Sequence, residues 1–198
     1  MSAAPLHGLL LCGGASRRMG RDKAQLNYGG EPQLLRAWRL LTAVTGRAFV
    51  SIRDHQRDEP LRASMPQLID TYDAVGPAAG ILSAHDAFPE AAWLVIACDL
   101  PWLDGATLRA LVAARDPAKE ATAFASRFDG LPEPLCALWE PSIHQRLKQR
   151  HEAGSHCPRK VLIQADIRLL PPPGHALDNI NTAQEYQKQM QGQMEVLS

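Results

Sequence analysis

Blocks of apolar residues interrupt the polar sequence at intervals, and the shortest uninterrupted blocks have the pattern of buried strands. Such runs occupy residues Gly8–Cys12, Ala48–Ile52 and Trp93–Ala97. A short continuous apolar run flanked by glycine, charge or a turn is typical of a strand covered on both faces of a sheet. Further extended segments are expected at Leu26–Tyr28, Leu68–Ile69, Ala121–Ala125 and Leu135–Trp139.

Segments with helical spacing separate these strands. Apolar residues from Leu34 to Val44 recur every three or four positions, and Gly46 ends that pattern. Asp104 is expected to cap the helix that follows it. Helices are expected at Leu34–Val44, Gly80–Phe88, Ala106–Ala114, Pro141 to about Arg150, Pro158–Gln164 and Ala183–Met194, and a loop at Pro171–Gly174.

Strands that alternate with helices predict an α/β fold of three layers, with helices on both faces of a mostly parallel, Rossmann-like sheet. A length of 198 residues without an internal repeat, linker or low-complexity block favours a single domain over residues 1–198. We expect roughly the last ten residues to fray. In sheets of this kind ligands bind at the carboxyl ends of the strands, so the residues there are the first candidates for a site.

Charge and cysteine content narrow the function classes. Lys plus Arg and Asp plus Glu both number 21, so no overall field favours nucleic acid or an acidic membrane surface as partner. The four cysteines are widely spaced without a C-x-x-C pair, which argues against a zinc site or a disulfide framework. No signal-peptide pattern begins the sequence, and no apolar run approaches the ~20 residues of a membrane span. We therefore expect a cytoplasmic protein.

The segment after the first strand carries the densest candidate chemistry. Gly13 and Gly14 follow the apolar run directly, and Arg17, Arg18 and Lys23 come soon after them. Glycines allow backbone N–H groups to approach an anion, and the cations add positive charge, as a triphosphate requires. The spacing matches neither a Walker P-loop nor the G-x-G-x-x-G dinucleotide fingerprint. A glycine-rich turn followed by a solvated basic stretch is the alternative from these residues alone.

Two aspartates stand at the ends of later strands. Asp99 follows the run Trp93–Ala97 by two positions and precedes Leu100-Pro101, where a carboxylate can ligate a hard cation such as Mg²⁺. Asp70 ends another short apolar segment. Either aspartate could instead cap a turn. Together with the glycine segment, they predict polar or glycine-rich chemistry at three strand ends along one edge of the sheet.

The stretch from Leu11 to Lys23 resembles the signature L-x-G-G-x-S-x-R-M-G-x-D-K of a nucleotidyltransferase superfamily, and more narrowly that of the molybdenum cofactor guanylyltransferase family. The resemblance spans roughly Leu9 to Tyr186 and implies a Rossmann-like nucleotidyltransferase fold. Three further motifs follow in the family's order: Gly76-Pro77-Ala78-Ala79-Gly80 for G-P-L-A-G, Cys98-Asp99-Leu100-Pro101 for C-D-x-P, and Asn179-Ile180-Asn181-Thr182 for N-x-N-T-P.

The resemblance implies transfer of GMP from GTP to Mo-molybdopterin, with release of pyrophosphate and formation of the guanine dinucleotide form of the cofactor. It implies that Asp99 binds Mg²⁺, and we expect Arg18 and Lys23 to stabilise the charge that builds on the phosphates. Molybdopterin-delivering proteins and molybdoenzymes are the expected protein partners. The nucleotide is expected to contact Leu11, Cys12, Gly13, Gly14, Lys23, Ser51, Asp70 and Asp99, and the acceptor to contact Asn179, Asn181 and Arg159.

Two positions depart from the family's pattern. Ser51 stands where the family commonly carries an asparagine that reads the nucleotide, and a hydroxyl offers one donor where an amide offers two. Ala183 stands where the family has proline, which should loosen a helix start more than it alters the chemistry. Two alternatives therefore remain: a molybdopterin cytidylyltransferase, or another small-acceptor nucleotidyltransferase such as a sugar-phosphate enzyme. A nucleotide-binding module without catalysis is the alternative from another class, and Lys23 and Asp99 argue against it.

Overall fold

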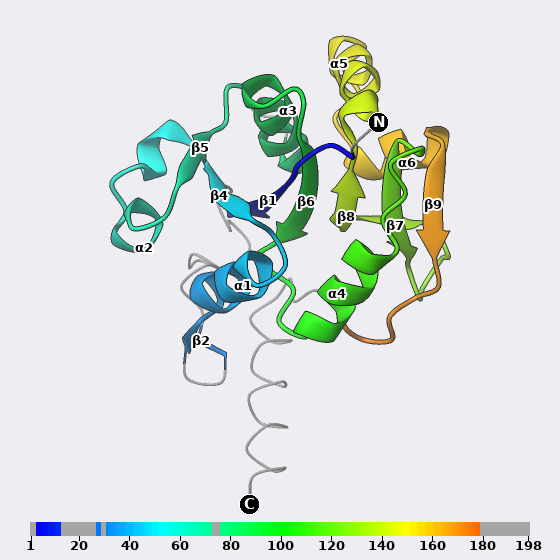
Figure 1. Cartoon of the computed structure of the whole chain (residues 1–198). Coiled ribbons are helices and arrows are strands. Elements are labelled where there is room, and N and C mark those ends of the chain that lie inside the picture. Colours follow the sequence, from blue (N-terminus) through cyan, green and yellow to red (C-terminus); the bar gives the residue numbers. More distant parts are fainter. Residues whose placement is uncertain (1–2, 13–26, 29–30, 73–75, 179–198) are drawn as a thin grey trace, which may run out of the picture.

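The structure is a computed structural model and describes residues 3–12, 27–28, 31–72 and 76–178 (Figure 1). Its strands are β1 (Leu6–Leu11), β2 (Asn27–Tyr28), β3 (Glu31–Pro32), β4 (Arg47–Ile52), β5 (Gln67–Ile69), β6 (Ala92–Ala97), β7 (Ala121–Ala125), β8 (Pro132–Trp139) and β9 (Ile167–Leu170). Its helices are α1 (Gln33–Thr42), α2 (Pro60–Ala63), α3 (Pro77–Ala87), α4 (Gly105–Ala113), α5 (His144–Glu152) and α6 (Pro158–Gln164), with 3₁₀ turns η2 (Asp54–Gln56) and η3 (Pro141–Ile143).

A seven-stranded sheet in the order β5-β4-β1-β6-β8-β7-β9 forms the centre of the described residues. Strands β5, β4, β1 and β6 are parallel to one another, as the sequence predicts. Strand β8 runs antiparallel to both of its neighbours, and β9 is parallel to β7. The carboxyl ends of β1, β4, β5, β6 and β7 therefore meet at the same edge, where β8 begins.

Helices cover both faces of the sheet, so the three predicted layers are confirmed (Figure 1). Side chains of β1 alternate between the two faces, as they must in a strand. Leu10 belongs to the apolar core that includes residues of α1 and α4, whereas Leu9 belongs to the core on the other face that includes residues of α3, α5 and α6. Helix residues in these two layers include Leu34, Leu41, Leu108 and Leu111 on one face, and Ile81, Leu82, Leu147 and Leu162 on the other.

Local chemistry explains most of the helix starts. Helix α4 begins at Gly105, one residue before the predicted Ala106, and Oδ1 of its predicted cap Asp104 accepts a 2.7 Å hydrogen bond from the Thr107 N–H. Helix α3 begins at Pro77, three residues before the predicted Gly80, directly after Gly76 with its φ of 62°. The helix predicted from Pro141 opens instead as the turn η3 before α5. The predicted helix Ala183–Met194 lies outside the described residues.

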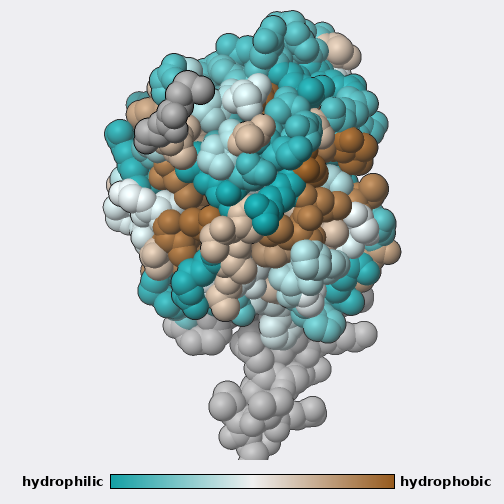
Figure 2. Space-filling view, turned by 45° about the vertical axis from the view of Figure 1, so that its right-hand side comes forward, coloured by the Kyte–Doolittle hydropathy of each residue, from teal (hydrophilic) through white to brown (hydrophobic). Residues whose placement is uncertain are grey.

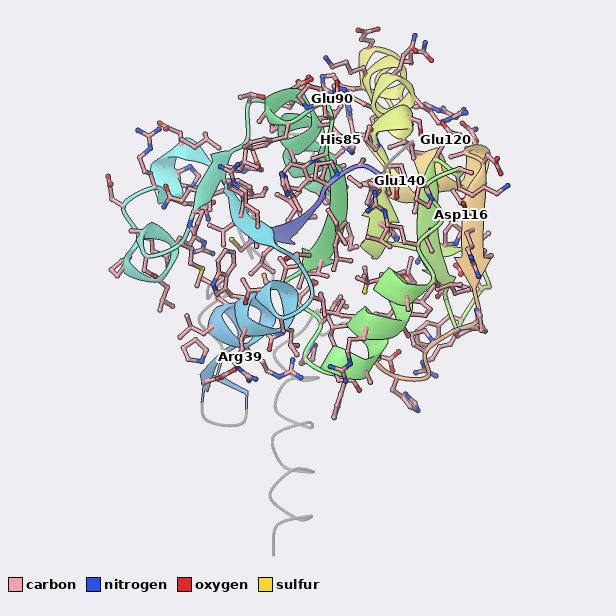
Figure 3. The ribbon with its side chains drawn as sticks, in the orientation of Figure 1. Arg39, His85, Glu90, Asp116, Glu120 and Glu140 are labelled. Atoms are coloured by element: carbon pink, nitrogen blue, oxygen red, sulfur yellow. The ribbon has the colours of Figure 1, made fainter. Side chains whose placement is uncertain are left out.

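Ion pairs stabilise the edge of the sheet at the amino ends of the parallel strands. Arg115 donates to both carboxylate oxygens of Glu140 at 2.6 and 2.8 Å, and Arg146 donates to both oxygens of Glu120 at 3.0 Å. Figure 3 shows Glu120 and Glu140 at neighbouring ends of β7 and β8, with Asp116 close by. These charges are thus committed to structure at the edge opposite the predicted site.

Exposed apolar side chains are scattered over the described surface. Figure 2 shows brown hydrophobic patches separated by teal hydrophilic surface on the side of the molecule that carries β9. Scattered apolar exposure of this kind is normal for a folded protein. No described helix is long and apolar enough to cross a membrane. Among the described residues, the exposed large apolar side chains are Leu35, Trp102, Phe128, Leu131, Ile163 and Leu169.

Candidate functional site

Strands β1, β4 and β6 lie side by side, and their carboxyl ends bring several predicted site residues together. Leu11 pairs with Ser51 of β4 on one side and with the last residue of β6 on the other. Just beyond the paired residues, the Cys12 N–H donates to the Ser51 carbonyl at 3.4 Å, and the Cys98 N–H donates to the Leu11 carbonyl at 3.2 Å. Leu11, Cys12, Ser51 and the turn that contains Asp99 therefore occupy one edge.

The best-defined polar contact at this edge joins Ser51 and Asp70. The Ser51 hydroxyl donates to Oδ1 of Asp70 at 2.6 Å, and Ser51 is only 1% exposed. The Asp70 N–H donates to the Ile52 carbonyl at 2.8 Å, which extends the pairing of β4 and β5 to this edge. Burial raises the pKa of Asp70, against the lowering effects of the Ser51 hydrogen bond and the Arg53 charge. An ionised Asp70 offers acceptor oxygens to a ligand with N–H donors.

The close approach of α3 to this pair depends on Gly80. A Cβ atom at position 80 would lie 2.3 Å from the Ser51 hydroxyl oxygen and 2.7 Å from Cδ2 of Leu11. In the structure Gly80 allows the helix to approach Ser51 and Leu11, and so it shapes the site indirectly.

Two side chains of α3 hold the segment that follows Asp70. The Thr71 N–H donates to the Ser83 hydroxyl at 2.9 Å, and the Tyr72 hydroxyl donates to Oδ2 of Asp86 at 2.5 Å. Burial, together with that bond to Asp86, raises the pKa of Tyr72 to about 12. Tyr72 therefore stays protonated and keeps donating at any physiological pH.

Asp99 lies in the turn after β6 and is neither fully buried nor fully exposed. Two side chains of α1 fix the backbone of this turn: Gln33 Nε2 donates to the Leu100 carbonyl at 3.2 Å, and Arg36 Nη2 donates to the Leu103 carbonyl at 2.7 Å. No sequence pattern indicates Gln33 or Arg36, because a long side chain that reaches a distant backbone carbonyl leaves no local pattern.

The described residues contain no group of three His, Cys, Asp or Glu side chains placed to hold a metal ion. Mg²⁺ often needs fewer protein ligands, since it keeps several waters and takes one or two carboxylates together with substrate phosphates. Asp99 has the required oxygen chemistry, and its partial exposure at the strand end leaves it accessible. The residue therefore fits a Mg²⁺ site completed by substrate.

Arg62 also reaches this edge, although no sequence pattern predicts it. Its Nη2 donates to the Cys12 carbonyl at 2.9 Å, its side chain is 1% exposed, and it forms an ion pair with Glu59. Arg62 belongs to α2, a four-residue helix too short to show helical periodicity. The one available signal was Pro60, a residue favoured in the first turn of a helix.

The connection between β7 and β8 forms the other end of the same edge. Arg159 of α6 donates to Oδ2 of Asp129 at 3.0 Å and to Oε2 of Glu133 at 2.9 Å. Arg127 donates to both carboxylate oxygens of Asp178 at 2.7 and 2.8 Å. The predicted acceptor contact Arg159 is thus at the carboxyl edge, with its charge balanced by two carboxylates.

Six predicted site residues lie outside the described residues. They are Gly13, Gly14, Arg18 and Lys23 after β1, and Asn179 and Asn181 near the C-terminus. The described residues next to these segments are both held at the carboxyl edge, Cys12 by Arg62 and Asp178 by Arg127. Cys12 and Asp178, the described residues that adjoin these segments in the sequence, therefore both lie at the carboxyl edge of the sheet.

Comparison with known proteins connects this arrangement to one family. Residues 8–168 match the model of the MobA-like NTP transferase domain. The chain is 32% identical over 183 residues to a molybdenum cofactor guanylyltransferase of Pseudomonas aeruginosa, covering 90% of this chain and 91% of that protein. It is 37% identical over 187 residues to a molybdenum cofactor biosynthesis bifunctional protein of Synechocystis, covering 94% of this chain and 54% of the relative. This chain thus spans about half of that bifunctional protein.

A solved structure supports the fold. Molybdopterin-guanine dinucleotide biosynthesis protein A from Archaeoglobus fulgidus superposes with a TM-score of 0.79 and 20% identity, covering 96% of this chain and 99% of that one. At this identity the likeness establishes the fold alone. The Rossmann-like nucleotidyltransferase fold predicted from the sequence is confirmed.

Proposed function

Because this chain belongs to the MobA-like NTP transferase family, we propose that it transfers GMP from GTP to Mo-molybdopterin. The observation that supports this most is the convergence of Cys12, the Ser51–Asp70 pair and the Asp99 turn at one sheet edge. Nucleotides bind at the carboxyl edge of α/β sheets, so the arrangement suits a nucleotide substrate. The names of the Pseudomonas and Synechocystis relatives point to molybdenum cofactor synthesis as the setting.

The proposed reaction is one displacement at phosphorus. A phosphate oxygen of the acceptor forms a bond to the α-phosphorus of GTP, and the bond from that phosphorus to the bridging oxygen of the β-phosphate breaks. The leaving oxygen keeps the electron pair, so pyrophosphate departs and molybdopterin guanine dinucleotide remains. Transfers of this kind need positioning and charge neutralisation more than a protein nucleophile.

The cations of the glycine-rich segment suit the need for charge neutralisation. We propose that backbone N–H groups at Gly13 and Gly14 contact the nucleotide while Arg18 and Lys23 contact its phosphates. Negative charge grows on the leaving pyrophosphate as the reaction proceeds, and a fixed cation beside it stabilises the transition state more than the ground state.

Asp99 is the proposed Mg²⁺ ligand. When bound, the ion would neutralise phosphate charge and help to orient the triphosphate. The role of the chain's own residues is to hold the carboxylate in place, and Gln33 and Arg36 do this through the carbonyls of Leu100 and Leu103.

Base recognition is proposed for the Ser51–Asp70 pair. Guanine presents N1–H and N2–H₂ as donors, and an ionised Asp70 presents acceptors to them. The 2.6 Å bond from Ser51 orients the Asp70 carboxylate. Asn179, Asn181 and Arg159 are proposed to meet the acceptor, with molybdopterin-delivering proteins and molybdoenzymes as protein partners.

One position keeps the cytidylyltransferase alternative open. Ser51, which bonds to Asp70, stands where the guanylyltransferase family commonly carries an asparagine. A hydroxyl already committed to a carboxylate has no second hydrogen to give to a base. Base choice therefore rests on Asp70 and the backbone after β1.

The direct test is product formation by the purified protein. GTP labelled at the α-phosphate, Mg²⁺ and molybdopterin are incubated with the protein, and both pyrophosphate and the dinucleotide are quantified by chromatography and mass spectrometry. Equal amounts of pyrophosphate and guanine dinucleotide support the proposal. GTP binding with neither product would favour a binding module without catalysis.

A further inference from the structure

Arg62 carries a buried guanidinium that contacts both an acidic side chain and a distant backbone carbonyl. It is one of the three largest fully buried side chains among the described residues, the other two being Trp93 and Trp139. Its ion-pair partner Glu59 lies three residues earlier, and its Nη2 reaches 50 positions back in the sequence to the Cys12 carbonyl at 2.9 Å.

A buried arginine is costly to maintain. Removing a guanidinium from water carries a desolvation penalty, and an apolar side chain of similar volume often packs as well or better. The penalty is offset only when hydrogen bonds and opposite charge surround the group. The contact with Cys12 is therefore informative, because the arginine bonds to a backbone carbonyl at the site edge in addition to pairing with Glu59.

The contact matters because of where the Cys12 carbonyl stands in the sequence. Cys12 is the last residue before Gly13-Gly14 in the sequence. A peptide group is planar, so a carbonyl oxygen held by a fixed donor also fixes the plane of the peptide that leads into the glycines. The guanidinium suits this task because its planar array of N–H groups can bond to two acceptors in a defined relative orientation.

We propose that Arg62 is a positioning residue for nucleotidyl transfer, which holds the Cys12 carbonyl and so fixes the backbone at the end of β1, where the nucleotide is proposed to bind. Arg62 contacts neither reacting atom; it acts through the backbone. This inference rests on the proposed function, and it adds a residue outside the motifs that carry the family resemblance.

The test compares Arg62→Ala with Arg62→Lys. Arg62→Ala removes the contacts with Glu59 and with the Cys12 carbonyl. We expect kcat/KM for GTP to fall on the order of 10²-fold, the size of effect that a misplacement of about 1 Å can produce. Most of the loss should fall on kcat, because the Arg62 contact bears on geometry during transfer. Arg62→Lys keeps the charge but cannot bond to both acceptors in the same way, and it should lose about tenfold.

Chemical rescue separates positioning from a general contribution to the fold. Guanidinium at a non-denaturing concentration should enter the space vacated in Arg62→Ala and restore at least tenfold in kcat, whereas ammonium at equal ionic strength should not. Arg57→Ala is the matched control, since Arg57 also pairs with an acid three residues earlier, Asp54 at 3.5 Å, but is 57% exposed. Arg57→Ala should retain wild-type kcat.

The outcomes are distinct. Turnover of GTP by the wild type tests the proposed function. The ratio of kcat in each variant to kcat in the wild type tests whether Arg62 is a positioning residue. A folded Arg62→Ala protein with wild-type kcat and KM, whatever its unfolding temperature, overturns the inference. If Arg62→Ala does not fold, Arg62→Lys decides: a reduced kcat with the fold intact supports positioning, and wild-type kcat overturns it.

Discussion

The hydroxyl of Ser51 donates a 2.6 Å hydrogen bond to Oδ1 of Asp70, across the end of two neighbouring parallel strands. Ser51 is buried beneath α3, so the bond gives the Asp70 carboxylate a fixed orientation. A carboxylate held in this way at the edge of a nucleotide-binding sheet is a stronger acceptor for base N–H groups than a mobile one, because less freedom is lost on binding. The pH dependence of GTP affinity and the effect of Gly80→Ala should both follow from this hydrogen bond.

The affinity for GTP should depend on the ionisation of Asp70. Burial raises the pKa of this carboxyl above its ordinary value of about 4. Only the ionised form accepts two hydrogen bonds from guanine, so affinity should be full above the pKa of Asp70 and should fall as the pH drops through it. Titration of a fluorescent GTP analogue across the acidic range measures this. Asp70→Asn should bind more weakly at neutral pH and show no acidic decline; an unchanged decline would assign it to another group.

Gly80→Ala should disturb the same pair from the opposite side. Alanine favours a helix over glycine by about 1 kcal/mol, but its Cβ would lie 2.3 Å from the Ser51 hydroxyl oxygen. We expect a net loss of roughly 1–3 kcal/mol in the free energy of unfolding, typical of overpacking. Gly46→Ala is the control, because a Cβ there meets nothing within 4 Å. Denaturant unfolding of both variants measures the change in the free energy of unfolding. A stabilised Gly80→Ala protein would contradict the packing described.

Lys23→Ala should affect turnover more than binding. The proposed contact with the phosphates strengthens as charge moves to the leaving pyrophosphate, so kcat should fall on the order of 10²-fold or more. Steady-state kinetics with GTP and molybdopterin measure kcat and KM separately. Lys119→Ala is a suitable control, since Lys119 pairs with Asp166 at 2.8 Å on the opposite edge of the sheet. A change confined to KM would mean that Lys23 only helps GTP to dock.

Asp99→Asn should abolish most turnover while the fold stays intact, because the apolar residues of β6 are untouched. The amide is a much weaker ligand for a hard cation than the carboxylate. The control is Asp104→Asn, which removes the same charge in the same loop while asparagine still caps α4. Activity of Asp99→Asn near the wild-type level in saturating Mg²⁺ would remove Asp99 from the metal role.

The sequence predicted the parallel half of the sheet well, because buried strands such as Trp93–Ala97 stand out as continuous apolar runs. It could not show that β8 is antiparallel, since a strand buried on both faces has the same pattern in either direction. It missed α2 and β9, which are four residues each and too short for periodicity. Motif residues at strand ends were found from their spacing, whereas Arg62, Gln33 and Arg36 act over long sequence separations and were not.

The choice of base tests the proposed site closely, because hydrogen-bond acceptors define that site. Guanine offers donors at N1 and N2, while cytosine offers acceptors at N3 and O2, which would leave the acceptors of the site unpaired. Each unpaired buried polar group costs about 1–3 kcal/mol, so each lost contact should give roughly ten- to a hundredfold discrimination.

The decisive measurement is kcat/KM for GTP, CTP and ATP with the same molybdopterin acceptor, in the wild type and in Asp70→Ala. We expect GTP to be used well ahead of CTP and ATP, and Asp70→Ala to narrow the difference in kcat/KM between GTP and CTP. A preference for CTP would contradict guanylyl transfer and make the protein a cytidylyltransferase, with the fold and the Asp99 assignment unaffected.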